Sequence, residues 1–207
     1  MECPRSCGGV RMNMPPVLDA CCGSRMFWFD KYDDRALFID NREDVYAVDK
    51  GTPGTVGRSP IVVAPDVIAD FTDLPFDDGS FHVVVFDPPH IKRDEIRGTL
   101  TRCYGILRGD WKGMLAKGFA ECFRVLKPNG TLVFKWAESQ FPIKEILALT
   151  PERPLFGHKT SKTTHWAVFI KPHASAIEAR RAETLGSVHE SAARQGDAQS
   201  TPGTPHE

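Results

Sequence analysis

The chain has 207 residues, of which 41% are hydrophobic, and this is enough for one domain with an ordinary core. Its longest apolar runs, such as residues 81–86 and 166–170, are far shorter than the ~20 residues of a membrane-spanning helix. The 26 Lys and Arg residues nearly balance the 27 Asp and Glu residues, so the net charge of −1 neither requires nor excludes a polyanionic partner. We therefore expect a soluble, cytoplasmic protein with no membrane partner.

The six cysteines do not form the pattern of a disulfide-stabilised or zinc-binding domain. Cys21 and Cys22 are adjacent, and Cys3 and Cys7 have no second ligand pair at the spacing of a zinc site. We expect reduced thiols and no metal.

Charge is distributed unevenly along the chain. Residues 12–89 contain 6 Lys and Arg against 14 Asp and Glu, whereas residues 90–135 contain 10 Lys and Arg against 4 Asp and Glu. The acidic part suits a small cationic ligand, and the basic part can contact phosphates. A solvated helix surface explains the basic part equally well.

Short apolar runs separated by turn-forming residues predict the elements of the first half. Residues 81–86 form an apolar, β-branched run of the kind found in buried parallel strands. In chain order we expect a strand at 17–18, a turn at 20–25, a helix at 26–32, a strand at 36–39, a loop at 49–60, and strands at 66–69 and 81–86.

The second half begins with the strongest helical periodicity, at residues 111–126, with Asp110 as N-cap and a stop at 128–130. A strand at 131–136, a helix at 143–149 and a strand at 164–170 follow. Alternating strands and helices predict an α/β fold around a mostly parallel sheet. The expected domain spans 15–172, between a flexible extension at 1–14 and a polar, disordered tail at 173–207.

Four polar features fall at the carboxyl ends of expected strands, where open α/β sheets bind ligands. They are the small-residue turn that begins with Asp19, then Asp40, the pair Asp70-Phe71, and Asp87-Pro88-Pro89-His90. Their order and spacing resemble class I S-adenosylmethionine-dependent methyltransferases. The segments 72–81 and 124–130 are similar to that family's regions after its third strand and before its fifth, and the resemblance covers 17–171.

The resemblance implies a Rossmann-like methyltransferase fold, with a mostly parallel seven-stranded sheet and helices on both faces. It implies S-adenosyl-L-methionine as cofactor. The turn with Asp19, Ala20, Cys21 and Gly23 would hold the methionine end, Asp40 the ribose, and Asp70 with Phe71 the adenine ring. The family usually has Gly at the positions of Cys21 and Arg25, so we expect Arg25 to point away from the sulfonium or to reach the carboxylate.

The sequence Asp87-Pro88-Pro89-His90 resembles the Asp-Pro-Pro-aromatic motif of amino-group methyltransferases. An exocyclic amino group attacks poorly because its lone pair is delocalised into the base. The Asp87 carboxylate and the Pro88 carbonyl can accept its two N–H bonds and aim the lone pair at the methyl group. Pro89 stiffens the loop, and His90 would stack on the base. The arrangement resembles small phage-type DNA N6-adenine methyltransferases.

Three hypotheses follow from this resemblance. The leading one is methylation of N6 of adenine in DNA, with RNA adenine or a protein amide as alternative acceptors. A non-catalytic binding module built on the cofactor fold is the third. Cytosine C5 methylation is disfavoured because the chain has no Pro-Cys dipeptide. Trp136, His158 and Lys159 are candidates for the substrate side, although a buried Trp and a solvated hairpin explain them better.

Overall fold

The computed structural model describes residues 14–47 and 60–173. The chain divides into two units, Met1–Lys171 and Pro172–Glu207. The predicted extension and tail therefore lie almost wholly outside the described residues, as do Cys3, Cys7 and nearly all of the loop expected at 49–60. No helix within the described ranges is long and apolar enough to cross a membrane.

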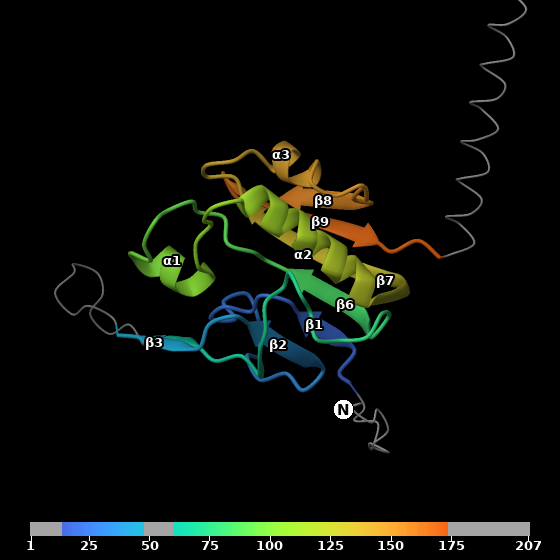
Figure 1. Cartoon of the computed structure of the whole chain (residues 1–207), viewed down its shortest axis with the longest axis horizontal. Coiled ribbons are helices and arrows are strands. Elements are labelled where there is room, and N and C mark those ends of the chain that lie inside the picture. Colours follow the sequence, from blue (N-terminus) through green and yellow to red (C-terminus); the bar gives the residue numbers. More distant parts are fainter. Residues whose placement is uncertain (1–13, 48–59, 174–207) are drawn as a thin grey trace, which may run out of the picture. The chain divides into compact units, whose positions relative to one another are not determined.

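Seven strands form one sheet in the order β5-β2-β1-β6-β7-β9-β8 (Figure 1). The first five are parallel to one another, and β9 runs antiparallel to both β7 and β8. The α/β fold with a mostly parallel seven-stranded sheet that the sequence predicts is thereby confirmed. The strands are β1 (Val17–Asp19), β2 (Ala36–Asp40), β5 (Val67–Ile68), β6 (Phe81–Phe86), β7 (Leu126–Ala137), β8 (Phe156–Lys159) and β9 (Thr164–Ile170).

Three helices and a small hairpin complete the described part: α1 (Thr99–Tyr104), α2 (Trp111–Val125), α3 (Ile143–Leu147), and β3 (Asp44–Tyr46) paired with β4 (Ile61–Val63). The carboxylate of Asp110 accepts a hydrogen bond from the backbone N–H of Gly113 at 3.1 Å, which confirms the expected cap of α2. The helix ends at Val125, before the predicted stop, because the chain passes directly into β7. Residues 128–130 lie inside that strand.

The main core lies between α2 and one face of the sheet, and Figure 1 shows α2 crossing β6 and β7. The ring of Phe119 lies 4.9 Å from Phe134 and 5.3 Å from Phe86, measured between centroids. All three side chains are buried, and each contributes about 1.5–3 kcal/mol through removal from water. The helix thus packs against β6, which leads into Asp87-Pro88-Pro89, and against the adjacent strand β7.

On the opposite face, Phe38 of β2 contacts the connection between β1 and β2. The predicted helix at 26–32 is wrong, because this segment forms turns. Arg25 adopts a positive φ of 52° and places its guanidinium carbon 3.8 Å from the centre of the Phe38 ring. Trp28 packs edge-on against the same ring at 4.8 Å. These tertiary contacts fix the segment in a non-helical path and hold Arg25 against Phe38.

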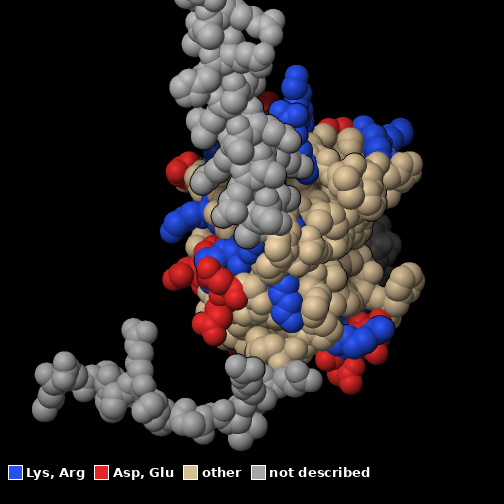
Figure 2. Space-filling model, turned by 90° about the vertical axis from the view of Figure 1, so that its right-hand side faces the viewer, with Lys and Arg blue, Asp and Glu red and all other residues tan. Residues whose placement is uncertain are grey.

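The face shown in Figure 2 carries both signs of charge around a broad uncharged area. On the part of this face that the grey residues leave visible, Lys and Arg side chains lie beside Asp and Glu.

Gly23 shows how tightly the turn after β1 packs against α1. Its φ is +49°, and a Cβ built there would lie 2.2 Å from the carbonyl oxygen of Cys103. Gly109 has nearly the same φ, +50°, and a Cβ built there would have nothing within 4 Å.

Gly109→Ala should lower the free energy of unfolding by about 1 kcal/mol, the cost of placing Ala in the left-handed region. Gly23→Ala should cost ~1–3 kcal/mol more because α1 must move. Urea denaturation measures both, and equal losses would contradict the packing argument.

Candidate active site

Three carboxylates lie at the carboxyl ends of neighbouring central strands. Asp19 ends β1, Asp40 ends β2, and Asp87 follows β6 directly. Because these strands are parallel and adjacent, their ends meet at one edge of the sheet. The three residues are only 0%, 5% and 2% exposed. Burial of so much negative charge in one place requires specific partners.

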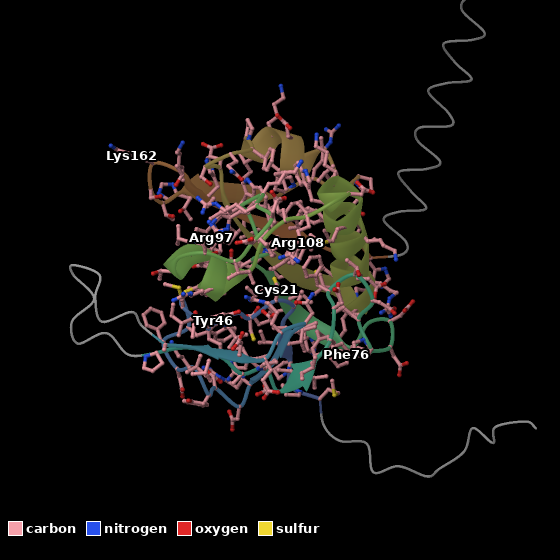
Figure 3. All side chains as sticks on the ribbon, turned by 60° about the vertical axis from the view of Figure 1, so that its left-hand side comes forward. Cys21, Tyr46, Phe76, Arg97, Arg108 and Lys162 are labelled. Atoms are coloured by element: carbon pink, nitrogen blue, oxygen red, sulfur yellow. The ribbon has the colours of Figure 1, made fainter. Side chains whose placement is uncertain are left out.

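A cavity of about 410 Å³ lies at this edge, within the range of small-molecule sites. It brings together five of the predicted residues, namely Ala20, Cys21, Asp40, Phe71 and Pro89. Asp19, Gly23, Asp70, Asp87, Pro88 and His90 do not line it. Other lining residues were not predicted: Asn41, Arg42, Ile96, Tyr104, Gly105, Ile106, Arg108 and Met114. Figure 3 labels two of the lining residues, Cys21 and Arg108, which lie near each other in the middle of that view.

The carboxylate of Asp40 is fully occupied within the chain. Oδ2 accepts from the backbone N–H of Gly23 at 2.9 Å and from Nη2 of Arg42 at 3.1 Å. Oδ1 accepts from the backbone N–H and from Nε of Arg42, at 3.0 and 2.9 Å. An ionised carboxylate offers about four acceptor positions. A ribose hydroxyl can therefore bond to Asp40 only by replacing one of these bonds, three of which come from Arg42.

Asp19 is held by the turn that follows it. Its Oδ2 accepts from Nε1 of Trp28 at 2.8 Å, and Oδ1 accepts from the backbone N–H of Cys21 at 3.3 Å. The pKa of Asp19 is raised to about 7, chiefly by burial and in part by the charges of Asp87 and Asp40, while the two hydrogen bonds lower it. Asp19 therefore holds the turn around Cys21 in place through these hydrogen bonds.

Asp70 and Phe71 have separate roles in the structure. Asp70 accepts from the backbone and side chain of Thr72, and its second oxygen accepts from Nδ2 of Asn41 at 3.0 Å. Asn41 lines the cavity and so connects Asp70 to it. Phe71 is 6% exposed, with its ring edge-on to Phe86 at 5.2 Å. Phe71 therefore belongs both to the core and to the cavity wall.

Asp87 forms the closest ion pair of the site. Its Oδ2 accepts from Nζ of Lys135 at 2.6 Å, whereas its Oδ1 is buried and has no hydrogen-bond partner among the described residues. Burial raises the pKa of Asp87 to about 6, and the ammonium of Lys135 limits this rise. The pKa of Lys135 is raised, because Asp87 outweighs the lowering effect of burial. The pair is therefore charged near neutral pH, with one free carboxylate oxygen.

His90 lies under the cavity wall and is 5% exposed. Its ring centre is 5.2 Å from Tyr104 and 6.2 Å from Trp136. Burial, followed by the charge of Lys135, lowers the pKa of His90 to about 4, so the imidazole is neutral. Tyr104 lines the cavity, and His90 packs behind its ring.

The residues proposed for the substrate side separate into two groups. Trp136 is fully buried and donates from Nε1 to the carbonyl of Phe141 at 3.0 Å, so it belongs to the core. His158 and Lys159 are exposed on β8, in the predicted hairpin, and Lys159 pairs with Glu138 at 2.8 Å. Neither group lines the cavity.

Sequence reasoning missed several site residues, among them Lys135 and Arg42, which donate to predicted carboxylates, and Tyr104, which accepts from Lys135. Lys135 interrupts an apolar strand between Phe134 and Trp136, and this charge inside a buried run was the available signal. No group of three His, Cys, Asp or Glu in the described ranges is arranged to hold a metal ion.

No protein-family model matches the sequence, and no curated protein matches it. Solved structures do resemble the fold. A protein from Pyrococcus horikoshii OT3 has 16% identity, with 74% of this chain and 80% of that one aligned, at a TM-score of 0.49. A SAM-dependent methyltransferase from Methanosarcina mazei has 13% identity, with 76% and 92% aligned, at 0.47. The N-methyltransferase NodS from Bradyrhizobium japonicum WM9 has 15% identity, with 76% and 84% aligned, at 0.38. These similarities concern the fold alone.

The raised pKa of Asp19 predicts a pH-dependent stability. Its value of about 7 in the folded chain exceeds the ordinary 3.8, so the unfolded chain loses this proton first. The free energy of unfolding should therefore fall by up to roughly 4 kcal/mol as the pH rises from about 4 to about 7. Asn cannot titrate, so the stability of Asp19→Asn relative to the wild type should increase across this window.

Urea denaturation at several pH values measures this difference. Asp33→Asn is the matched control, because hydrogen bonds from Arg35 hold the pKa of Asp33 at about 2 and its contribution stays constant above pH ~4. If the difference in the free energy of unfolding between Asp19→Asn and the wild type did not change with pH, Asp19 would be ionised in the folded protein across this window.

Proposed function

We propose that this protein transfers a methyl group from S-adenosyl-L-methionine to an amino nitrogen, N6 of adenine in DNA. One observation carries this proposal: the buried Oδ1 of Asp87, at the end of a central strand and followed by two prolines, has no hydrogen-bond partner among residues 14–47 and 60–173. An unpaired carboxylate oxygen in a desolvated position is costly unless a ligand completes it. An N–H donor is the complement of that oxygen.

The geometry supports activation of a conjugated amino group. Oδ1 of Asp87 accepts one N–H and the Pro88 carbonyl accepts the other, which directs the nitrogen lone pair away from the ring. Bound S-adenosyl-L-methionine supplies an electrophilic methyl group on a sulfonium. As the new nitrogen–carbon bond forms and the sulfur–carbon bond breaks, Asp87 accepts the proton that the nitrogen loses. With a pKa of about 6, Asp87 is ionised at neutral pH and able to do so.

The cavity fits the cofactor in size and chemistry. The carboxyl-end position, the small turn residues Ala20 and Cys21, and the acidic residue Asp40 on the next strand agree with a nucleoside ligand that ends in an amino acid. In this proposal ribose hydroxyls replace two of the bonds that Arg42 donates to Asp40. Asn41 and Phe71 lie at the adenine end.

The acceptor base lies on the Tyr104 side of the cavity. Pro89 and Tyr104 line the cavity whereas Asp87 and His90 do not, so in this proposal the base displaces part of the lining to reach Oδ1. We assign the stacking role of His90 to the pair of His90 and Tyr104, in which the buried neutral imidazole supports the Tyr104 ring. The basic composition of 90–135 and Arg108 at the cavity support a nucleic-acid acceptor.

Cofactor binding can be measured by calorimetry with S-adenosyl-L-methionine and its demethylated product. Asp40→Ala should weaken binding by ~1–3 kcal/mol, the loss of a buried hydrogen-bonding partner. Arg42→Ala should leave affinity unchanged or increase it, because it removes the group that competes for Asp40. Equal weakening in both variants would mean that Arg42 itself contacts the cofactor. Absence of binding by the wild type would rule out the enzyme.

Transfer can be measured with methyl-labelled cofactor and separate DNA, RNA and protein acceptors. Asp87→Asn should lower the rate by about 10²–10³-fold, because it removes contacts made in the transition state, while cofactor affinity stays within about threefold. Asp94→Asn, at an exposed position close in sequence, is the control. We expect label in DNA. Label in RNA or protein alone would reassign the acceptor, and equal activity of Asp87→Asn would remove Asp87 from the mechanism.

A further inference from the structure

Lys135 reaches Asp87 across the central strands of the sheet. The strands β6 and β7 are parallel neighbours with Phe86 opposite Phe134, so the next residue on each strand is Asp87 and Lys135. Nζ of Lys135 lies 2.6 Å from Oδ2 of Asp87 and 3.4 Å from the Tyr104 hydroxyl. The side chains are 12% and 2% exposed for Lys135 and Asp87. A buried pair of this kind adds little net stability over an apolar pair, so its presence calls for a chemical reason.

Three aromatic rings surround the ammonium of Lys135. Their centres lie 4.6, 5.5 and 5.9 Å from Nζ, for Tyr104, Phe27 and Trp166 respectively. The rings come from three separate parts of the chain: α1, the connection after β1, and β9. Attraction of the ammonium to the ring faces restrains it, while Asp87 remains its only carboxylate partner in the described part of the chain. The cation is therefore fixed in place and directed at one oxygen.

We propose that Lys135 is a positioning residue, which holds Oδ2 of Asp87 so that Oδ1 alone faces the acceptor amino group and stays able to accept a hydrogen bond. This inference rests on the proposed function. A lysine ammonium has three donors and no acceptor, so it can donate only to an oxygen of residue 87. With Asn at position 87, Lys135 would bind the amide oxygen and turn the NH₂ group toward the substrate. Lys135 thus makes the site specific for Asp at this position.

Lys135 also controls the charge of Asp87. The titratable groups around this carboxylate are Lys135, Tyr104, Asp19, Cys21 and His90, and Lys135 is the cation among them. Burial raises the pKa of Asp87 and the ammonium of Lys135 lowers it, so removal of the ammonium should raise this pKa further. A protonated carboxyl group donates where the mechanism needs an acceptor. Loss of Lys135 should therefore remove activity first at low pH.

The direct test is a carboxyl-carbon NMR titration of the full chain labelled at Asp, with Asp87→Asn used to assign the signal. In Lys135→Met the pKa of Asp87 should rise by about 1 or more relative to the wild type. Lys127→Met, also on β7 but at a distance from the site, should leave it unchanged. An unchanged pKa of Asp87 in Lys135→Met would overturn the inference. No acceptor is present in this titration, so a shifted pKa with no transfer to any acceptor would defeat only the proposed function.

Kinetics supply the second readout. The acidic limb of the pH profile of kcat/KM should move to higher pH in Lys135→Met and return toward the wild type in Lys135→Arg. Asp87→Asn with Lys135→Met should be about tenfold faster than Asp87→Asn alone, because the amide can then turn its oxygen to the substrate. A double variant no faster than Asp87→Asn would show that Lys135 does not select the free oxygen.

Discussion

The structure depends on the burial of three carboxylates at one edge of its sheet. Asp19, Asp40 and Asp87 lie on adjacent strands, and each is stabilised by a different kind of donor. Trp28 donates to Asp19, Arg42 donates to Asp40, and Lys135 donates to Asp87. These donors come from the turn after β1, the segment after β2, and β7. Satisfying the carboxylates therefore determines how the loops around the cavity fold.

The three carboxylates differ in what they leave free. Asp40 has all four acceptor positions filled by Gly23 and Arg42, and both oxygens of Asp19 are bonded. Asp87 alone keeps an oxygen without a partner among the described residues. Two carboxylates thus organise the binding region, and the third retains capacity for chemistry. This division explains why the Asp-Pro-Pro segment carries the functional proposal.

Features encoded locally were predictable from the sequence. The apolar run of β6, the cap of α2 at Asp110 and the strand at 164–170 follow from side-chain pattern, so these elements of the fold were predicted correctly. The helix expected at 26–32 was wrong because the contacts of Arg25 with Phe38 override local propensity. The pair of Asp87 and Lys135 joins residues 48 positions apart. Only the register between β6 and β7 brings them together, and no local pattern reports it.

The central claim is that Asp87 activates an amino nitrogen of adenine. Its most direct test is the identity of the methylated atom. DNA treated with the protein and cofactor that carries a labelled methyl group is digested to nucleosides, which are separated and analysed by mass spectrometry. The account predicts label in N6-methyldeoxyadenosine. Label in 5-methylcytosine, or on an oxygen of any acceptor, would contradict it, because neither atom presents the N–H that the free oxygen of Asp87 requires.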